Sequence, residues 1–156
     1  MKQKELAVYL KLIIIIVTIM FLFFIVWFLP TSIMEIIVPN IVPIIIGYLW
    51  VGSIPCLLAL FQFFKICGRI GNDNSFCIEN ARGLKKMSLM MFIVTVYGMA
   101  GLAIIFITGF YHIYKFSSAA IMVAIVISIT LAIVCAALSH LVQKASVLQE
   151  EHDLTV

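Results

Sequence analysis

Charged residues are scarce in this sequence. Asp, Glu, Lys and Arg make up 11% of the 156 residues, whereas 65% are hydrophobic and the formal net charge is +3. A soluble globular domain has about 25% charged and about 45–50% apolar residues. A chain of this length cannot bury so many apolar side chains in a water-soluble fold. The composition therefore excludes a soluble domain and indicates a membrane protein.

The long apolar runs also lack charge near their centres. Charged side chains inside a membrane usually mark proton relays and ion paths, because they are costly to place there. Their absence argues against an ion-coupled pump. It leaves open a passive role or a role in contact with lipid.

Motifs for catalysis and metal binding are missing as well. No C-x-x-C pair joins the four cysteines, which are Cys56, Cys67, Cys77 and Cys135. H-E-x-x-H, G-x-S-x-G and P-loop motifs do not occur, although metalloproteases, hydrolases and nucleotide-binding proteins depend on them. Ser139 and His140 are neighbours in the sequence, so they point to different faces of a helix. We therefore expect no enzymatic activity, no catalytic residue, no metal and no cofactor.

Four apolar runs are present, over about residues 6–29, 41–66, 86–111 and 118–142. A hydrocarbon core about 30 Å thick is crossed by about 20 helical residues. Backbone groups in lipid must be satisfied within the segment, so each run should form a helix. The sequence predicts an all-α polytopic protein, a single membrane domain over residues 1–156 with four transmembrane helices in an antiparallel bundle.

The basic residues indicate which side of the membrane each loop occupies. With four spans, both termini and the loop at residues 67–85 share one side. That side carries Lys2, Lys4, Lys11, Lys65, Arg69, Arg82, Lys85, Lys86 and Lys144, and the other side carries only Lys115. Loops rich in Lys and Arg stay in the cytoplasm. We therefore expect a multi-pass membrane protein with both termini in the cytoplasm.

The predicted cytoplasmic loop contains an amphipathic turn. Phe76, Asn80 and Leu84 fall on one helical face, whereas Arg82 and Lys85 lie toward other faces. Basic residues at the inner interface meet anionic headgroups, each contributing about 1 kcal/mol. One interpretation is a positive-inside anchor in contact with the bilayer. The other is a docking site for a cytoplasmic partner, which would also use Glu79.

The fourth span carries a stripe of small residues at every fourth position. The stripe consists of Ala120, Ala124, Ser128, Ala132 and Ala136. Small residues let helices approach closely in lipid, so we expect this face to pack inside the bundle. A homodimer formed through the same stripe is the alternative. In the second span, Pro55 should kink the helix near Val51–Gly52.

The tail, residues 143–156, extends the helical pattern past the fourth span. Leu138, Leu141, Ala145 and Leu148 follow helical spacing. An acidic end follows, with Glu150, Glu151 and Asp153, and Leu154 comes directly after them. The interpretations are a solvated helix end or a segment that binds a partner.

Two stretches together resemble a bacterial family of small four-span membrane proteins, DUF2975. The first is Phe76-Cys77-Ile78-Glu79-Asn80 followed by Leu84-Lys85-Lys86-Met87, and the second is the terminal LQEEHDLTV. Cys77 stands where the family often has Ser or Thr, so the helix after it should be less well capped. The resemblance implies an inner-membrane protein of unknown biochemistry, often encoded beside a small helix-turn-helix DNA-binding protein.

Two hypotheses of different class follow. In the first, the cytoplasmic turn and tail bind a small helix-turn-helix transcription regulator, so the protein is a non-enzymatic regulator or tether that does not itself contact nucleic acid. In the second, the bundle moves a small hydrophobic solute or peptide, or gives immunity to a membrane-active peptide. Changes at Pro55 or Ser128 should damage a transporter most, whereas removal of residues 150–156 should damage a tether most.

Overall fold

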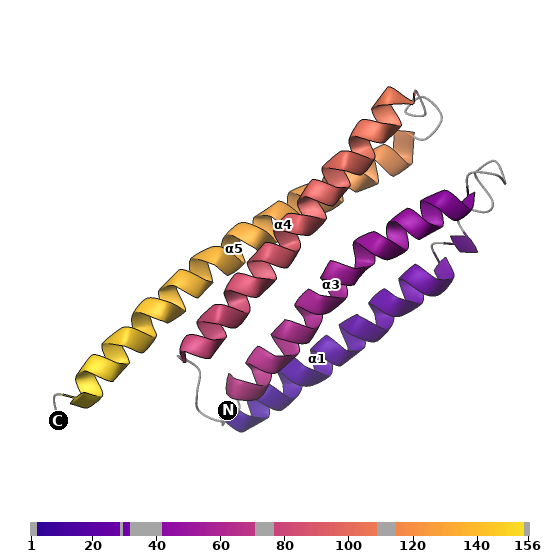
Figure 1. The fold of residues 1–156 in the computed structure, drawn as a ribbon. Coiled ribbons are helices and arrows are strands. Elements are labelled where there is room, and N and C mark those ends of the chain that lie inside the picture. The colour runs from indigo at the N-terminus through magenta and orange to yellow at the C-terminus, as the bar shows by residue number, and fades with distance from the viewer. Residues whose placement is uncertain (1–2, 29, 32–41, 71–76, 109–114, 155–156) are drawn as a thin grey trace. The chain divides into compact units, whose positions relative to one another are not determined.

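The computed structural model describes residues 3–28, 30–31, 42–70, 77–108 and 115–154, and these are helical except at Cys77 and Thr108. Its long helices are α1 (Gln3–Phe23), α3 (Val42–Ile70), α4 (Ile78–Ile107) and α5 (Lys115–Leu154), and a π-helix, η1 (Phe24–Phe28), continues α1. These described parts contain no strand. Figure 1 shows the helices in chain order.

Four of these segments are long and apolar enough to cross a membrane, which confirms the predicted spans. They are Val8–Trp27, Pro43–Ile70, Ile78–Ile107 and Ile121–Leu148. The helices α4 and α5 extend well past the apolar runs, because α4 begins at Ile78 and α5 ends at Leu154. The protein is therefore a multi-pass membrane protein whose helices contact the lipid bilayer.

The chain divides into two compact units, Met1–Asp73 and Asn74–Val156. In the first unit, α1 packs against α3; in the second, α4 packs against α5. The arrangement of all four helices as one bundle stays a prediction.

The π-helix η1 ends two residues before a proline, Pro30. Pro30 has no N–H to donate to a carbonyl one turn earlier, and its ring crowds that turn. In membrane helices, π-type widening and nearby hydroxyls satisfy the carbonyls that proline leaves free. Here the Thr31 hydroxyl donates to the Trp27 carbonyl over 2.9 Å, and the rings of Phe23 and Trp27 stack with centroids 6.5 Å apart.

Pro55 lies inside α3, which continues as one helix from Val42 to Ile70. Near it, the Ser53 hydroxyl donates to the Trp50 carbonyl over 2.7 Å. The second span is therefore not divided into two half-helices. Broken helices of that kind line the substrate sites of many transporters.

Candidate functional site

The second unit is held together by an antiparallel seam between α4 and α5. Side-chain hydrogen bonds cross it between described residues: Ser88 Oγ to the Ala132 carbonyl (2.8 Å), Thr95 Oγ1 with Ser128 Oγ (2.9 Å) and Ser139 Oγ to the Ala81 carbonyl (2.7 Å). Such bonds between membrane helices contribute on average about 0.6 kcal/mol each. The polar residues of these two spans therefore join the helices.

The seam follows a spacing of 3.5 residues, which is typical of helices packed side by side. In α5, its buried residues are Ser128, Ala132, Cys135 and Ser139. At Gly98 of α4, the helices approach so closely that an added Cβ would lie 2.9 Å from Ile125 Cγ1. Glycine at this position permits the close approach.

The small-residue stripe of α5 is only partly inside this seam. Ser128 and Ala132 are buried, whereas Ala124 and Ala136 are exposed. The side chain of Ala120 lies outside the described residues. Each residue turns a helix by about 100°, so a step of four residues drifts by about 40° around it. A stripe with every step equal to four therefore leaves the seam at both ends.

Two contacts fix the register at the polar end of the pair. Ala81 lies beside Ser139, and Ser88 lies beside Ala132. The basic side chains of α4 between these levels, Arg82, Lys85 and Lys86, are therefore level with residues 132–139 of α5. Because α4 begins only three residues before Ala81, the end of α5 runs past it. Figure 1 shows α5 continuing beyond the start of α4. Residues 143–154 of this helix would extend about 18 Å at about 1.5 Å per residue.

The predicted partner-binding residues of α4 do not all face outward. Glu79, Arg82 and Lys85 are exposed, and Leu84 is half-buried. Asn80 is only 2% exposed. Burial places Asn80 among the residues that support the first turn of α4, and takes it off the surface that a partner could touch.

The remaining predicted residues lie at the limits of the described structure. Phe76 lies outside the described residues. Glu150, Glu151, Asp153 and Leu154 belong to the last turns of α5, while their side chains lie outside the described part. The helix therefore continues through the acidic segment almost to the end of the chain.

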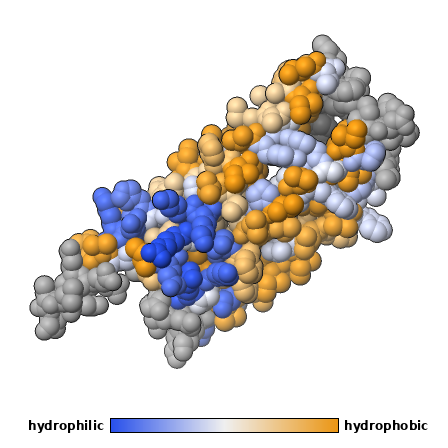
Figure 2. All heavy atoms as spheres, in the orientation of Figure 1, coloured by the Kyte–Doolittle hydropathy of each residue, from blue (hydrophilic) through white to orange (hydrophobic). Residues whose placement is uncertain are grey.

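The projecting part of α5 presents a mixed surface that the sequence reasoning did not assign to the site. Leu141 and Leu148 are 63% and 65% exposed. Val147 and Leu148 line one shallow hollow together with the exposed polar residues His140, Gln143 and Lys144. Figure 2 shows hydrophilic residues gathered at this end. The signal was present in the spacing of Leu138, Leu141 and Leu148, which continues beyond the apolar run.

Cys77 is the N-cap of α4. Its backbone is extended (φ −101°, ψ 149°), as a capping residue requires, and its carbonyl accepts hydrogen bonds from the N–H groups of Asn80 and Ala81. Its side chain makes no capping hydrogen bond. This confirms the expectation that cysteine leaves the helix start less well capped than Ser or Thr would.

Replacing Cys77 with serine should stabilise the first turn of α4 by about 1 kcal/mol, because a serine hydroxyl can accept a capping hydrogen bond from a backbone amide of that turn, which the cysteine side chain does not do. The measurement is amide hydrogen exchange at Glu79 and Asn80 in detergent, where we expect slower exchange. Cys77→Ala is the control and should not slow it. Equal exchange in both variants would contradict the capping argument.

Among the described residues, no group of three His, Cys, Asp or Glu side chains is placed to hold a metal ion. The four cysteines are free thiols, and Cys67 and Cys135 are buried. The candidate site is thus a surface formed by the start of α4 and the end of α5.

Comparison with known proteins gives two matches. A family model described as "Protein of unknown function (DUF2975)" matches residues 2–156. The chain is similar to "Uncharacterized membrane protein YoaS" of Bacillus subtilis (strain 168), with 30% identity over 114 residues, covering 70% of this chain and 68% of that protein. No solved structure matches.

Proposed function

The chain belongs to the DUF2975 family of proteins of unknown function, and on that premise we propose that it is a non-enzymatic membrane tether for a small helix-turn-helix transcription regulator. In this proposal, the protein lies in the bacterial cytoplasmic membrane with both termini inside. The start of α4 and the end of α5 hold the regulator, and a change in the membrane releases it.

The observation that carries the proposal is the projection of α5 beyond the start of α4. The hydrocarbon core needs about 20 residues of a helix, whereas α5 has 40 residues. Its last third carries the exposed Leu148 together with the exposed polar residues Gln143 and Lys144, beyond the level of Arg82 and Lys85 of α4. Apolar anchors within a polar rim are typical of surfaces that bind proteins.

The acidic end of α5 adds a second argument. The C-terminal end of a helix carries a partial negative charge, so acidic residues there are unfavourable by about 0.3–1 kcal/mol each. Glu150, Glu151 and Asp153 all lie in the last turns of α5. A partner with a basic surface would compensate both the carboxylates and the helix end.

A DNA-binding protein has such a basic surface. Its contacts with phosphates are largely electrostatic. An acidic helix end that occupies the same surface would compete with DNA, so tethering would also keep the regulator off its operator. No direct contact between the membrane protein and nucleic acid is needed.

The test is purification of the full-length protein from native membranes in mild detergent, beside a variant that lacks residues 150–156. We expect a small DNA-binding protein to accompany the full-length chain, and its recovery to fall at least about tenfold with the truncation. The reason is that the loss of three charge contacts of about 1 kcal/mol each should lower the affinity for the partner by more than about tenfold. Mass spectrometry of the purified material measures both.

The matched control keeps the chain length and changes only charge: Glu150→Gln, Glu151→Gln and Asp153→Asn together. This variant should lose the partner as the truncation does, whereas Ser128→Ala, in the seam, should retain it. Recovery of no cytoplasmic partner by the full-length chain would overturn the proposal. A phenotype confined to Pro55→Ala or Ser128→Ala would favour transport or immunity instead.

A further inference from the structure

The first unit contains an open apolar groove between α1 and α3. Its volume is about 350 Å³, and it is lined by Ile14, Ile15, Thr18 and Ile19 of α1 and by Leu57, Leu60, Phe61 and Phe64 of α3. Thr18 donates its hydroxyl to the Ile14 carbonyl over 2.7 Å, so it is satisfied within its own helix. The lining therefore suits a hydrocarbon chain.

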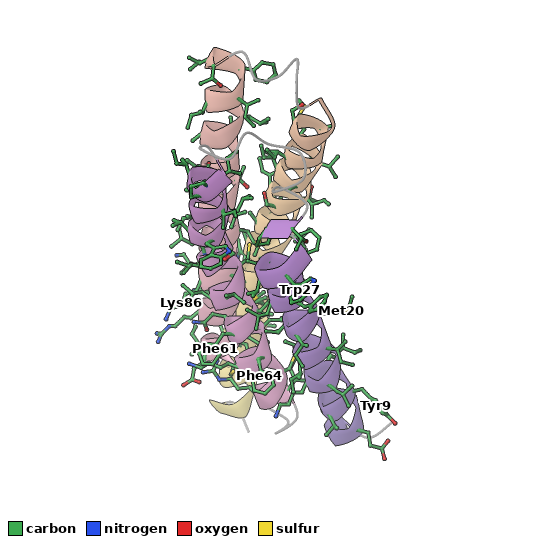
Figure 3. All side chains as sticks on the ribbon, turned by 90° about the vertical axis from the view of Figure 1, so that its right-hand side faces the viewer. Tyr9, Met20, Trp27, Phe61, Phe64 and Lys86 are labelled. Atoms are coloured by element: carbon green, nitrogen blue, oxygen red, sulfur yellow. The ribbon has the colours of Figure 1, made fainter. Side chains whose placement is uncertain are left out.

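Two lysines lie at one end of this groove, each over a ring that lines it. The Lys11 ammonium of α1 lies 5.8 Å from the centre of the Phe64 ring, and the Lys65 ammonium lies 4.6 Å from the centre of the Phe61 ring. These distances are typical of cation–π contacts. Figure 3 shows both phenylalanines toward the end of α3 that lies beside the start of α1, where Tyr9 is labelled.

Lys11 reaches from α1 onto the surface of α3. Its Cε and Nζ would each lie 3.5 Å from a Cβ added at Gly68, so the bare glycine surface leaves room for the lysine stem. Glu5 is the only acidic residue in the described part of this unit. Lys11 and Lys65 therefore give this end of the groove a positive charge.

We propose that this groove binds an anionic phospholipid. One acyl chain lies against Ile15, Ile19 and Leu57, and the phosphate lies between the ammonium groups of Lys11 and Lys65. Charge complementarity selects this occupant, because a hydrocarbon chain alone needs no cation, whereas basic pockets between membrane helices bind anionic headgroups. The proposal does not depend on the tethered regulator.

The test is native mass spectrometry of the full-length protein with phosphatidylglycerol and phosphatidylethanolamine that carry the same acyl chains. We expect the protein to retain phosphatidylglycerol preferentially. The double variant Lys11→Gln/Lys65→Gln should lower that preference by about fivefold for each lysine removed. The matched control, Lys86→Gln/Lys144→Gln, removes the same charge from exposed positions of the second unit and should lower the preference much less, because neither lysine lies at this groove.

A second variant tests the groove without changing charge. Leu57→Trp adds volume to the lining, so it should lower retention of both lipids in a protein that remains helical by circular dichroism. Equal retention of the two lipids by the unmodified protein would overturn the proposal. So would an equal loss of preference in both lysine variants. Unchanged retention of lipid by Leu57→Trp would also overturn it, because the lipids would then bind outside the groove.

Discussion

Replacing Gly98 with leucine should destabilise the α4–α5 pair by about 3 kcal/mol. An added Cβ would lie 2.9 Å from Ile125 Cγ1 and 3.4 Å from its Cδ1, closer than packed carbon atoms normally approach. Inserting extra carbons into a packed interface costs about 1–3 kcal/mol, and leucine adds four of them. The helices must separate or shift, and the seam of hydrogen bonds along them should weaken.

Cys135 provides the measurement, because it lies in the seam and is 8% exposed. In a chain whose other three cysteines are replaced, the rate at which a maleimide labels Cys135 reports opening of the pair. A loss of about 3 kcal/mol raises the open population, and hence this rate, by about 100-fold. The circular dichroism spectrum shows whether the helices themselves persist.

Gly47→Leu is the matched control, since no atom of the described residues lies within 4 Å of a Cβ added there. Leucine is a better helix former than glycine by up to about 1 kcal/mol, so this variant should be neutral or stabilising. Gly98→Leu/Ile125→Ala should recover part of the loss, because it removes the atoms that clash. Slow labelling of Cys135 in Gly98→Leu would contradict the close approach of the helices.

Replacing Ala132 with leucine should cost about 2–3 kcal/mol for a related reason. Ala132 is 5% exposed, and its carbonyl accepts the Ser88 hydroxyl over 2.8 Å. Three added carbons have no space in the seam, and moving α4 away also breaks this hydrogen bond. We expect Cys135 to be labelled at least about 30-fold faster than in the parent chain.

Ala136→Leu is the control for this change, one step further along the same stripe. Ala136 is exposed, so leucine there should change the labelling rate by less than about twofold, as for most surface substitutions. Equal effects of the two substitutions would mean that the whole stripe is packed. A stripe packed at both positions would return attention to the homodimer alternative, in which a second copy covers Ala124 and Ala136.

The sequence by itself determined the four spans and the class of protein. Hydrocarbon thickness sets the length of an apolar helix, and lipid leaves the backbone no alternative to a helix in such segments. The single position of Cys77 was also sufficient to predict a weakly capped start of α4, because capping depends on one side chain and its own backbone. The acidic end of the chain could be predicted to lie outside the apolar spans, because charged side chains are costly to place in the membrane.

Only the tertiary structure decided which face of each helix is packed. In water, an apolar stripe identifies the buried face, but in lipid both faces are apolar and the pattern does not distinguish them. The drift of 40° at each four-residue step took Ala124 and Ala136 out of the seam, and the contact with α4 buried Ser128 and Ala132. Likewise, the burial of Asn80 and the reach of Lys11 to Phe64 depend on residues distant in the chain, and no local pattern contains them.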